Sequence, residues 1–331
     1  MTTSKASQGR KRGTTKPPSL RLGLCCQFIN EPIAFRTTTA TALLRLDSDQ
    51  RRRKLSNFCR SNAESLLAAV RYLATNGIGC FRIPSSILPV RTHPQAGYDI
   101  ADLPGADEIV AAFRRCGELA AAHRIRLTFH PDQFVVLNSP RDDVVRKSLE
   151  ELESQAEIAE WVGADLINIH AGGAYGDKVQ ALDAFVRNVD RLSDRARMRL
   201  SIENDDRIYT PADLLPVCRT LGLPLVYDVH HHRCLPDGFT VEAATKETIE
   251  TWNREPLFHI SSPIAGWDGR GPHRHHDYID PQDFPDCWRD LPVTVEVEAK
   301  AKELAVLKLQ ETLGTLENRK IEKLVSREAG R

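Results

Sequence analysis

Six segments rich in apolar and β-branched residues each end on, or run directly into, a histidine, an aspartate or a glutamate. The segments are LTFH, LINIH, RLSIE, LVYD, LFHIS and VTVEVE, and their polar residues are His130, His170, Glu203, Asp228, His259 and Glu298, with His231 just after Asp228. Imidazole and carboxylate groups together are ligands for zinc, manganese or iron. One tetrahedral ion needs only four ligands, so this larger set predicts two or three divalent ions that share bridging carboxylates.

The strand-like segments alternate with longer amphipathic stretches. We expect strands at 21–26, 78–83, 125–130, 165–170, 198–203, 224–228, 256–260 and 293–298. We expect helices near 57–76, 105–124, 142–162, 178–196, 211–221 and 240–253, and helical turns near 282–290 and 299–310. Eight such alternations predict an α/β fold, the (β/α)8 TIM barrel, whose active site lies at the C-terminal rim of the strands. An open doubly wound sheet would need a glycine-rich loop after the first strand, where CCQFINEP stands instead.

Length and charge divide the chain into three parts. The 331 residues exceed the roughly 250 that a barrel needs. We expect a basic, disordered tail over 1–20, the barrel over 21–310 and a charged C-terminal tail over 311–331. The N-terminal tail could hold phosphates or only keep the chain soluble, and both remain open. It has no apolar segment typical of a secretion signal, and no apolar run is long enough to span a membrane. Eight cysteines without a CxxC pair indicate a reducing compartment.

Several longer motifs resemble those of one family, the UV damage endonucleases. They are LTFHPDQF, INIHAGGAYGDK, LSIENDDR, YDVHHH, FHISSP, HHDYID and VEVEAKAKE, and the resemblance runs from about Arg21 to about Leu309. It implies a barrel related to endonuclease IV and to xylose isomerase. It also implies two or three divalent ions, typically Mn²⁺, with Zn²⁺, Mg²⁺ and Co²⁺ as alternatives. The implied reaction is incision immediately 5′ of cyclobutane dimers, 6-4 photoproducts and some abasic sites, leaving a 3′-hydroxyl and a 5′-phosphate.

The resemblance also implies roles for particular residues. The implied metal ligands are His130, His170, Glu203, Asp228, His231, His259, His275 and Glu298. Gln133 and Phe134 match the pair that wedges into the duplex, and Leu24 stands where some members have a tyrosine near the lesion. At Leu257 the sequence departs from the family, because many members carry a lysine there that can be carboxylated and bind metal. We expect His273 to substitute as a ligand.

Catalysis would use three of these rim positions. We expect Glu203 to bridge metals and either Glu298 or a metal-bound hydroxide to act as a base. Lys300 would steady phosphate charge or be only a solvated lysine at the start of a helix. Because the formal net charge is zero, the basic side chains that hold DNA must gather on the rim. The candidates are Arg36, Arg82, Arg91 and Lys178. His230, His232 and His276 lie in histidine-rich stretches that can be merely polar.

The predicted partner is damaged double-stranded DNA, bound by a monomer. The location would be the cytoplasm with its nucleoid in a prokaryote, or the nucleus in a eukaryote. Two other readings remain open. A sugar isomerase or epimerase uses similar ligands on the same barrel but needs a closed pocket for a small polyol. A non-catalytic lesion-binding homologue that has lost a metal is consistent with Leu257.

Overall fold

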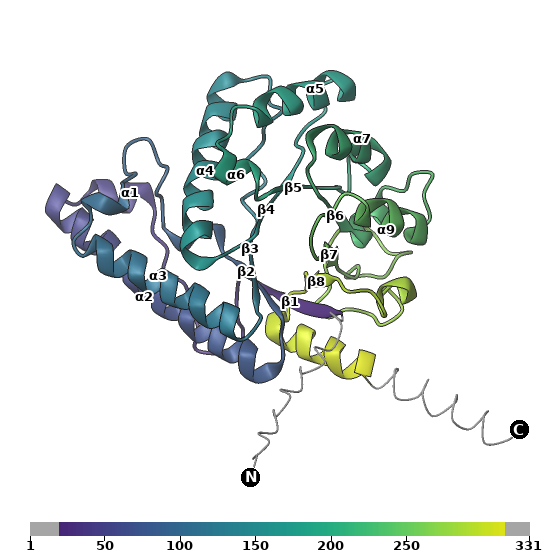
Figure 1. The fold of residues 1–331 in the computed structure, drawn as a ribbon, viewed down its shortest axis with the longest axis horizontal. Coiled ribbons are helices and arrows are strands. Elements are labelled where there is room, and N and C mark those ends of the chain that lie inside the picture. Colours follow the sequence, from purple (N-terminus) through teal and green to yellow (C-terminus); the bar gives the residue numbers. More distant parts are fainter. Residues whose placement is uncertain (1–19, 315–331) are drawn as a thin grey trace, which may run out of the picture.

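The computed structural model describes residues 20–314, and eight parallel strands form a closed barrel in it (Figure 1). The strands are β1 (Arg21–Cys25), β2 (Cys80–Ile83), β3 (Arg126–Phe129), β4 (Leu166–His170), β5 (Leu200–Glu203), β6 (Leu225–Asp228), β7 (Leu257–Ile260) and β8 (Thr294–Val297). Each strand pairs with the next in the chain, and β8 pairs with β1. The predicted barrel is confirmed, and each predicted strand overlaps an observed one. The two predicted tails lie almost wholly outside the described residues.

Helices surround the barrel and connect its strands (Figure 1). They are α1 (Ala40–Leu44), α2 (Ser48–Asn76), α3 (Ala106–Ala122), α4 (Asp142–Val162), α5 (Lys178–Val189), α6 (Asp194–Arg197), α7 (Pro211–Leu221), α8 (Val229–Cys234) and α9 (Val241–Ile249), with 3-10 turns at Ser85–Ile87, Ile100–Asp102 and Asp286–Trp288. A last helix covers 302–314. Among residues 20–314, no helix is long and apolar enough to cross a bilayer.

Local capping explains where the helices depart from the predicted ranges. The helix predicted near 57–76 begins at Ser48, because Asp47 and Gln50 form a capping box that starts α2 earlier. The helix predicted over 178–196 is two helices, since Ser193 caps the short α6 with its side chain. The last helix continues to 314 rather than ending near 310.

The period-two alternation of strands separates an inner and an outer set of side chains. Thr128 and Asn168 face the barrel interior, where they contact carboxylates of β8 and β5. Cys80, Leu166, Val226 and Leu257 form a small apolar layer inside the barrel. The main hydrophobic core includes Leu24, Val295 and Val297, which alternate with inward-facing residues and therefore face the surrounding helices. The strands thus place polar residues above a small apolar layer, towards the C-terminal rim.

Candidate metal centre

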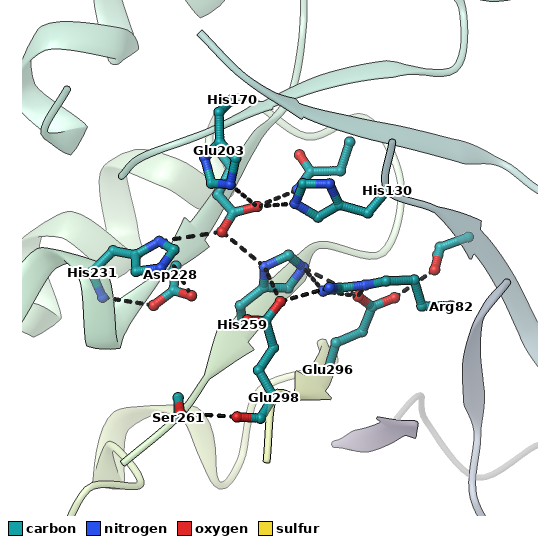
Figure 2. Close-up of polar contacts among 12 residues, drawn as sticks. Arg82, His130, His170, Glu203, Asp228, His231, His259, Ser261, Glu296 and Glu298 are labelled. Atoms are coloured by element: carbon teal, nitrogen blue, oxygen red, sulfur yellow. Dashed lines mark hydrogen bonds and ion pairs between the residues drawn. The ribbon is translucent and has the colours of Figure 1, made fainter. Parts of the chain in front are cut away.

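The predicted ligands gather at the C-terminal rim of the barrel in what we call the rim cluster. Glu203, the last residue of β5, lies at its middle (Figure 2). Its Oε2 is 3.0 Å from His130 Nε2 and 4.0 Å from His170 Nε2. Its Oε1 is 3.1 Å from His259 Nδ1 and 3.4 Å from His231 Nδ1. The carboxylate is 1% exposed. One buried glutamate is therefore shared by four imidazoles that come from different parts of the barrel.

Neighbouring hydrogen bonds orient His130, which follows β3, and Glu203, which ends β5. His130 Nδ1 lies 3.0 Å from the carbonyl oxygen of Pro131, which can accept an Nδ1 proton, and Nε2 is the ring nitrogen on the Glu203 side. Asn168 Nδ2 donates to Glu203 Oε2 at 2.5 Å, and Ser201 Oγ donates to Asn168 Oδ1 at 3.0 Å. Such partners fix the ring and carboxylate orientations that a metal site needs.

Asp228 links the end of β6 to His231. Its Oδ1 accepts from the backbone N–H of His231 at 2.8 Å, which caps the first turn of α8 and brings the His231 ring towards Glu203. Asp228 Oδ2 lies 3.5 Å from His231 Nδ1. Two groups of residues in the described chain each place their own ligand atoms within 4.8 Å of one another. One group is His130, His170 and Glu203, and the other is Glu203, Asp228 and His231.

Glu298 and Arg82 close the other side of the cluster. Glu298 Oε1 is 3.5 Å from His259 Nδ1, and its Oε2 is 3.7 Å from His275 Nδ1. Arg82 Nη1 donates to Glu298 Oε1 at 2.6 Å. The eight predicted ligands are thus brought together, since each forms a hydrogen bond or an ion pair with another member of the set.

Burial and opposite charge compete in setting the pKa values of this cluster. Burial raises the pKa of Glu203, but His259 and His170 beside it hold that pKa well below its usual range. Burial lowers the pKa of His231, but Asp228 and Glu203 raise it well above its usual value. Burial also lowers the pKa of His259, which Glu203 and Glu296 nevertheless raise to about 10. Glu203 is therefore ionised, as a carboxylate ligand must be.

The donor set and several unpartnered atoms fit divalent metal ions. Asp228 Oδ2, His170 Nδ1 and His259 Nδ1 are buried and form no hydrogen bond among the described residues, although Asp228 Oδ2 and His259 Nδ1 lie within ion-pair distance of His231 and Glu203. Buried polar atoms without partners are rare and call for a specific explanation, such as an ion. Imidazole nitrogens mixed with carboxylate oxygens suit zinc, manganese and iron. The residues present therefore fit the metal centre that their types predict.

Leu24 does not reach the site, which corrects the prediction that it contacts a lesion. It is 0% exposed and packs in the main core. Successive residues of a strand point to opposite faces, and Leu24 lies one residue from the inward-facing Gly23. A cysteine at the end of β1, Cys25, is also buried.

Two of the basic rim candidates are engaged inside the protein, which corrects their predicted contact with DNA. Arg82 is 7% exposed and binds Glu298. Arg91 pairs with Glu157 at 2.5 Å, and its guanidinium lies 5.8 Å from the ring centroid of Trp161. Both arginines are committed to internal contacts and are not free for phosphates.

The remaining basic candidates are exposed. The Arg36 side chain is exposed in the loop after β1, and its backbone is held by two hydrogen bonds with Asn62. Lys178 begins α5 and pairs with Asp213 at 2.9 Å. Lys300 follows Glu298 by two residues, and its backbone N–H donates to the carbonyl oxygen of His276. Arg36, Lys178 and Lys300 stay candidates for phosphate contacts.

His273 does not take the place of a strand-seven ligand. It is exposed, and within 20–314 it forms no hydrogen bond or ion pair with the rim cluster, whereas His275 pairs with Glu298. The backbone of the loop positions His275 through an isolated bridge to Pro263. Leu257 belongs to the apolar layer and provides no ligand atom.

A groove of about 950 Å³ opens beside the cluster. It is lined by His170 and His231 and by the exposed residues Gln133, Phe134 and Tyr175. Phe134 is 75% exposed and lines the groove, so its side chain is accessible to a molecule bound there. Phe134 is therefore not part of the hydrophobic core.

Two polar residues around the cluster were not predicted from the sequence, and a third, His230, had been considered merely polar. Asn168 and Glu296 face inward on β4 and β8, and their signal was the period-two spacing to His170 and Glu298. His230 is fully buried against Trp267 and His275, with ring centroids 5.2 Å apart in each case. Neither of its ring nitrogens has a hydrogen-bond partner among the described residues.

The fold and the site together define a class of protein: a (β/α)8 barrel enzyme with a multi-ligand imidazole and carboxylate site on its C-terminal rim. The family described as UV-endonuclease UvdE matches residues 20–329, and the chain belongs to this family. Membership identifies it as a DNA-repair endonuclease, and hence as a hydrolase. The resemblance noted in the sequence is confirmed.

Relatives and solved structures agree with this assignment. The chain is 32% identical over 293 residues to a UV DNA damage endonuclease of Bacillus velezensis, covering 85% of this chain and 89% of the relative. The corresponding enzyme of Bacillus cereus strain B4264 is 30% identical over 293 residues, covering 85% and 90%. The crystal structure of SacUVDE aligns with a TM-score of 0.80 at 28% identity, covering 90% of this chain and 99% of that one.

More distant structures share the fold alone. Endonuclease IV from Thermus thermophilus aligns with a TM-score of 0.57 at 15% identity, covering 90% of this chain and 99% of that one. D-psicose 3-epimerase from Clostridium cellulolyticum aligns with a TM-score of 0.52 at 14% identity, covering 76% and 92%.

Proposed function

We propose that this chain is a metal-dependent endonuclease that cuts the DNA backbone immediately 5′ of UV photoproducts and leaves a 3′-hydroxyl and a 5′-phosphate. Cyclobutane dimers and 6-4 photoproducts are the proposed lesions, with abasic sites as further substrates. The observation that carries the proposal is the position of Glu203. Its two oxygens face two groups of ligands at the edge of a groove from which Phe134 projects.

The proposed ligands are the eight clustered residues, with Glu203 as the bridging carboxylate. We assign two or three ions, with Mn²⁺ foremost and Zn²⁺, Mg²⁺ or Co²⁺ as alternatives. Bound there, divalent ions would neutralise charge on the scissile phosphate and lower the pKa of water towards neutrality. His130 supports this assignment, since its Nδ1 contact with the Pro131 carbonyl leaves Nε2 for a ligand role.

The protein groups would divide the remaining work. Glu298 Oε1 is held by Arg82, so Oε2 is the atom proposed to take a proton from the attacking water. The exposed ammonium of Lys300 would balance phosphate charge as it develops. Arg36 and Lys178 would hold the DNA backbone outside the reacting centre.

Lesion recognition would depend on Gln133 and Phe134. Both are exposed where the chain leaves β3, between His130 and α4. An aromatic wedge inserted into DNA must unstack a base step, which costs a few kcal/mol and less at a step that damage has already distorted. Deformability of the damaged step would therefore select the substrate without reading its sequence.

The competing functions are less well supported. A small polyol needs an enclosed pocket, whereas the groove beside Glu203 is wide and displays an exposed aromatic side chain. Leu257 had favoured a non-catalytic lesion-binding homologue, but the other proposed ligands are all present and clustered.

We further propose that the enzyme acts as a monomer on chromosomal DNA, in the nucleoid of a bacterial cytoplasm.

The proposed function is tested by nicking of UV-irradiated supercoiled plasmid with Mn²⁺, Zn²⁺, Mg²⁺ or Co²⁺ supplied singly. We expect nicks in irradiated plasmid with at least one metal, strongest with Mn²⁺, and none after chelation. Unirradiated plasmid and a parallel assay with ketose sugars are the controls. Lesion binding without nicking under every metal would instead support the non-catalytic alternative, and sugar turnover without nicking would support an epimerase.

A further inference from the structure

Tyr175 is a second exposed aromatic residue of the groove, and the proposed chemistry gives it no role. It lies in residues 171–177, which join His170 at the end of β4 to α5 and which we call the Tyr175 loop. Tyr175 is 53% exposed and lines the groove together with Phe134 and His170. The Tyr175 loop therefore connects a proposed metal ligand to an exposed aromatic ring.

The backbone of the Tyr175 loop has an uncommon conformation. Tyr175 has a φ of 48°, in the left-handed region where a bulky side chain is an outlier. Gly172 and Gly176 have φ values of 98° and 94°, which glycine adopts readily. Strained residues persist where the surrounding structure fixes them, and they gather at ligand-binding sites. Because this backbone alone would favour glycine or asparagine at position 175, the aromatic ring there needs an explanation.

One face of the Tyr175 ring is turned to the backbone of Gly173. A Cβ added at Gly173 would lie 3.0 Å from Tyr175 Cζ and 3.2 Å from both Cε1 and Cε2. Because these three ring carbons are nearly equidistant from it, the added atom would meet the face of the ring and not its edge. The ring would have to move, since packed side chains leave no room for such close contacts. Glycine at 173 thus lets the ring lie flat against the loop.

Hydrogen bonds from two neighbouring segments hold Gly173 in place. Its carbonyl oxygen accepts from Asn138 Nδ2 at 2.7 Å and from the Tyr209 hydroxyl at 3.1 Å. Asn138 and Tyr209 are both buried, so these donors are fixed by their surroundings. At the end of the loop, the backbone N–H of Asp177 donates to the carbonyl oxygen of Ala174 at 2.9 Å. The support under the ring is therefore built without any ligand.

The groove also offers cations beside the ring. Lys147 and Arg207 line it and are exposed. Four carboxylates line it as well, and each accepts a hydrogen bond from the protein: Asp132, Glu151, Asp205 and Asp206. A flat ring with cations nearby fits a nucleotide, because its base stacks on aromatic rings and its phosphate binds lysine and arginine.

We propose that the Tyr175 ring is a platform on which one base of the bound DNA stacks. Gly173 supports one face of the ring, and the base would cover the other. Stacking on an aromatic ring accepts any base, because every base has a flat π surface. The contact would thus fix a strand beside His170 without reading its sequence. This inference rests on the proposed function, because it takes DNA as the ligand of the groove.

The platform is tested directly with the fluorescent base 2-aminopurine, whose emission is quenched by stacking. Duplexes with one cyclobutane dimer carry it in turn at each position around the dimer, in either strand, and chelator prevents cutting. We expect one position where the bound base is quenched by the wild type and by Tyr175→Phe but not by Tyr175→Asn. Asparagine removes the ring and tolerates a positive φ. If no position responds to Tyr175→Asn, the proposal is overturned.

Binding affinity gives the second test, by fluorescence anisotropy with the dimer-containing duplex in chelator. We expect Tyr175→Asn to weaken binding by about 5- to 100-fold, which corresponds to one base–aromatic contact. Tyr175→Phe should bind as the wild type does, whereas Tyr175→Leu should not, because leucine is apolar but not flat. Val179→Asn is the matched control, because Val179 is exposed nearby but lies outside the groove lining. Wild-type affinity in Tyr175→Leu would contradict a stacking platform.

The contact between the ring and Gly173 supplies a third test. Gly173→Ala places a methyl group where the ring lies, so it should weaken binding about as much as Tyr175→Asn. Once Tyr175→Asn has removed the ring, adding Gly173→Ala should have little further effect, because the two changes act on one contact. Losses that simply add in the double variant would contradict the platform.

The outcomes separate this inference from the proposed function, because binding in chelator requires neither metal nor cutting. If the wild type nicks irradiated plasmid and Tyr175→Asn binds the duplex equally well, only the inference fails. If the wild type never nicks but its binding depends on the Tyr175 ring, only the proposed function fails. If the wild type does not bind the duplex, both fail. Urea unfolding checks folding, and Tyr175→Gly replaces Tyr175→Asn if that variant does not fold.

Discussion

At the scale of single residues, the proposed centre depends on Glu203, because no other described carboxylate faces both ligand groups. Replacing Glu203 with Gln removes its charge while keeping its shape. We expect Mn²⁺ affinity to fall and nicking to drop by on the order of 10³-fold, which corresponds to about 4 kcal/mol of lost transition-state stabilisation. Calorimetry and the plasmid assay measure the two effects. Glu247→Gln, which alters an exposed pair with Arg219, should change neither.

Phe134 supports a different prediction, because it is exposed and outside the cluster. Phe134→Ala should weaken binding to damaged duplex by about 1–3 kcal/mol, the usual contribution of one base–aromatic contact, and leave thermal stability unchanged. Fluorescence anisotropy with lesion-containing and undamaged duplexes checks this. Met198→Ala removes another exposed apolar side chain, on α6's C-terminal side, and should leave DNA binding intact. Equal weakening by both variants would contradict the wedge.

At the scale of elements, strand alternation decides which predicted residues reach the site. The predicted ligands at or just after strand ends could be found from residue type and strand order, whereas the loop residue His275 followed mainly from the resemblance to the family. The prediction for Leu24 was wrong because its side chain points outward from β1 into the main hydrophobic core. Glu296 was overlooked although it lies on the inward face of β8, two residues before Glu298, which follows the strand. The prediction that Arg82 contacts DNA was wrong because the sequence does not reveal that its guanidinium binds Glu296 and Glu298 inside the barrel.

The packing of α3 on α4 gives an element-scale prediction. A Cβ added at Gly117 would lie 2.5 Å from the carbonyl oxygen of Val162. Glycine to alanine in a helix normally stabilises by about 1 kcal/mol, but here the helices must separate. We expect Gly117→Ala to destabilise the protein by about 1–3 kcal/mol in urea unfolding. Glu118→Ala, at the exposed neighbour, is the control, and a stabilised Gly117→Ala would contradict this packing.

At the scale of the whole molecule, the two ends of the barrel have different chemistry. The C-terminal rim carries the site, and the opposite end carries structural ion pairs. Arg126 binds Asp165 through two hydrogen bonds of 3.0 Å and 2.8 Å, and Arg254 adds one of 3.1 Å. The barrel and its rim could be predicted from the sequence because both follow from periodicity. These pairs could not, since they join residues far apart in the chain.

The ion pairs at this end give a pH-dependent prediction. Burial raises the pKa of Asp165, but Arg126 and Arg254 outweigh it and lower that pKa below its usual value. A lowered folded-state pKa contributes stability above the unfolded value of about 3.9, and this is lost as pH falls through the folded value. Asp165→Asn should therefore cost about 1 kcal/mol at pH 7, a modest figure because Asp165 is 37% exposed. Urea unfolding should show the difference shrinking below pH 4, and a difference that grows there would contradict the assignment.

The central claim is that the Glu203 centre cuts DNA on the 5′ side of a photoproduct. An end-labelled duplex with one cyclobutane dimer at a known position tests it most directly, with Mn²⁺ and either the wild type or Glu203→Gln. We predict one cut by the wild type, immediately 5′ of the dimer, with a 3′ end that a polymerase extends and a 5′ end that a ligase accepts. Glu203→Gln should leave the duplex intact. Cutting elsewhere, ends that neither enzyme accepts, or equal cutting by Glu203→Gln would contradict the account.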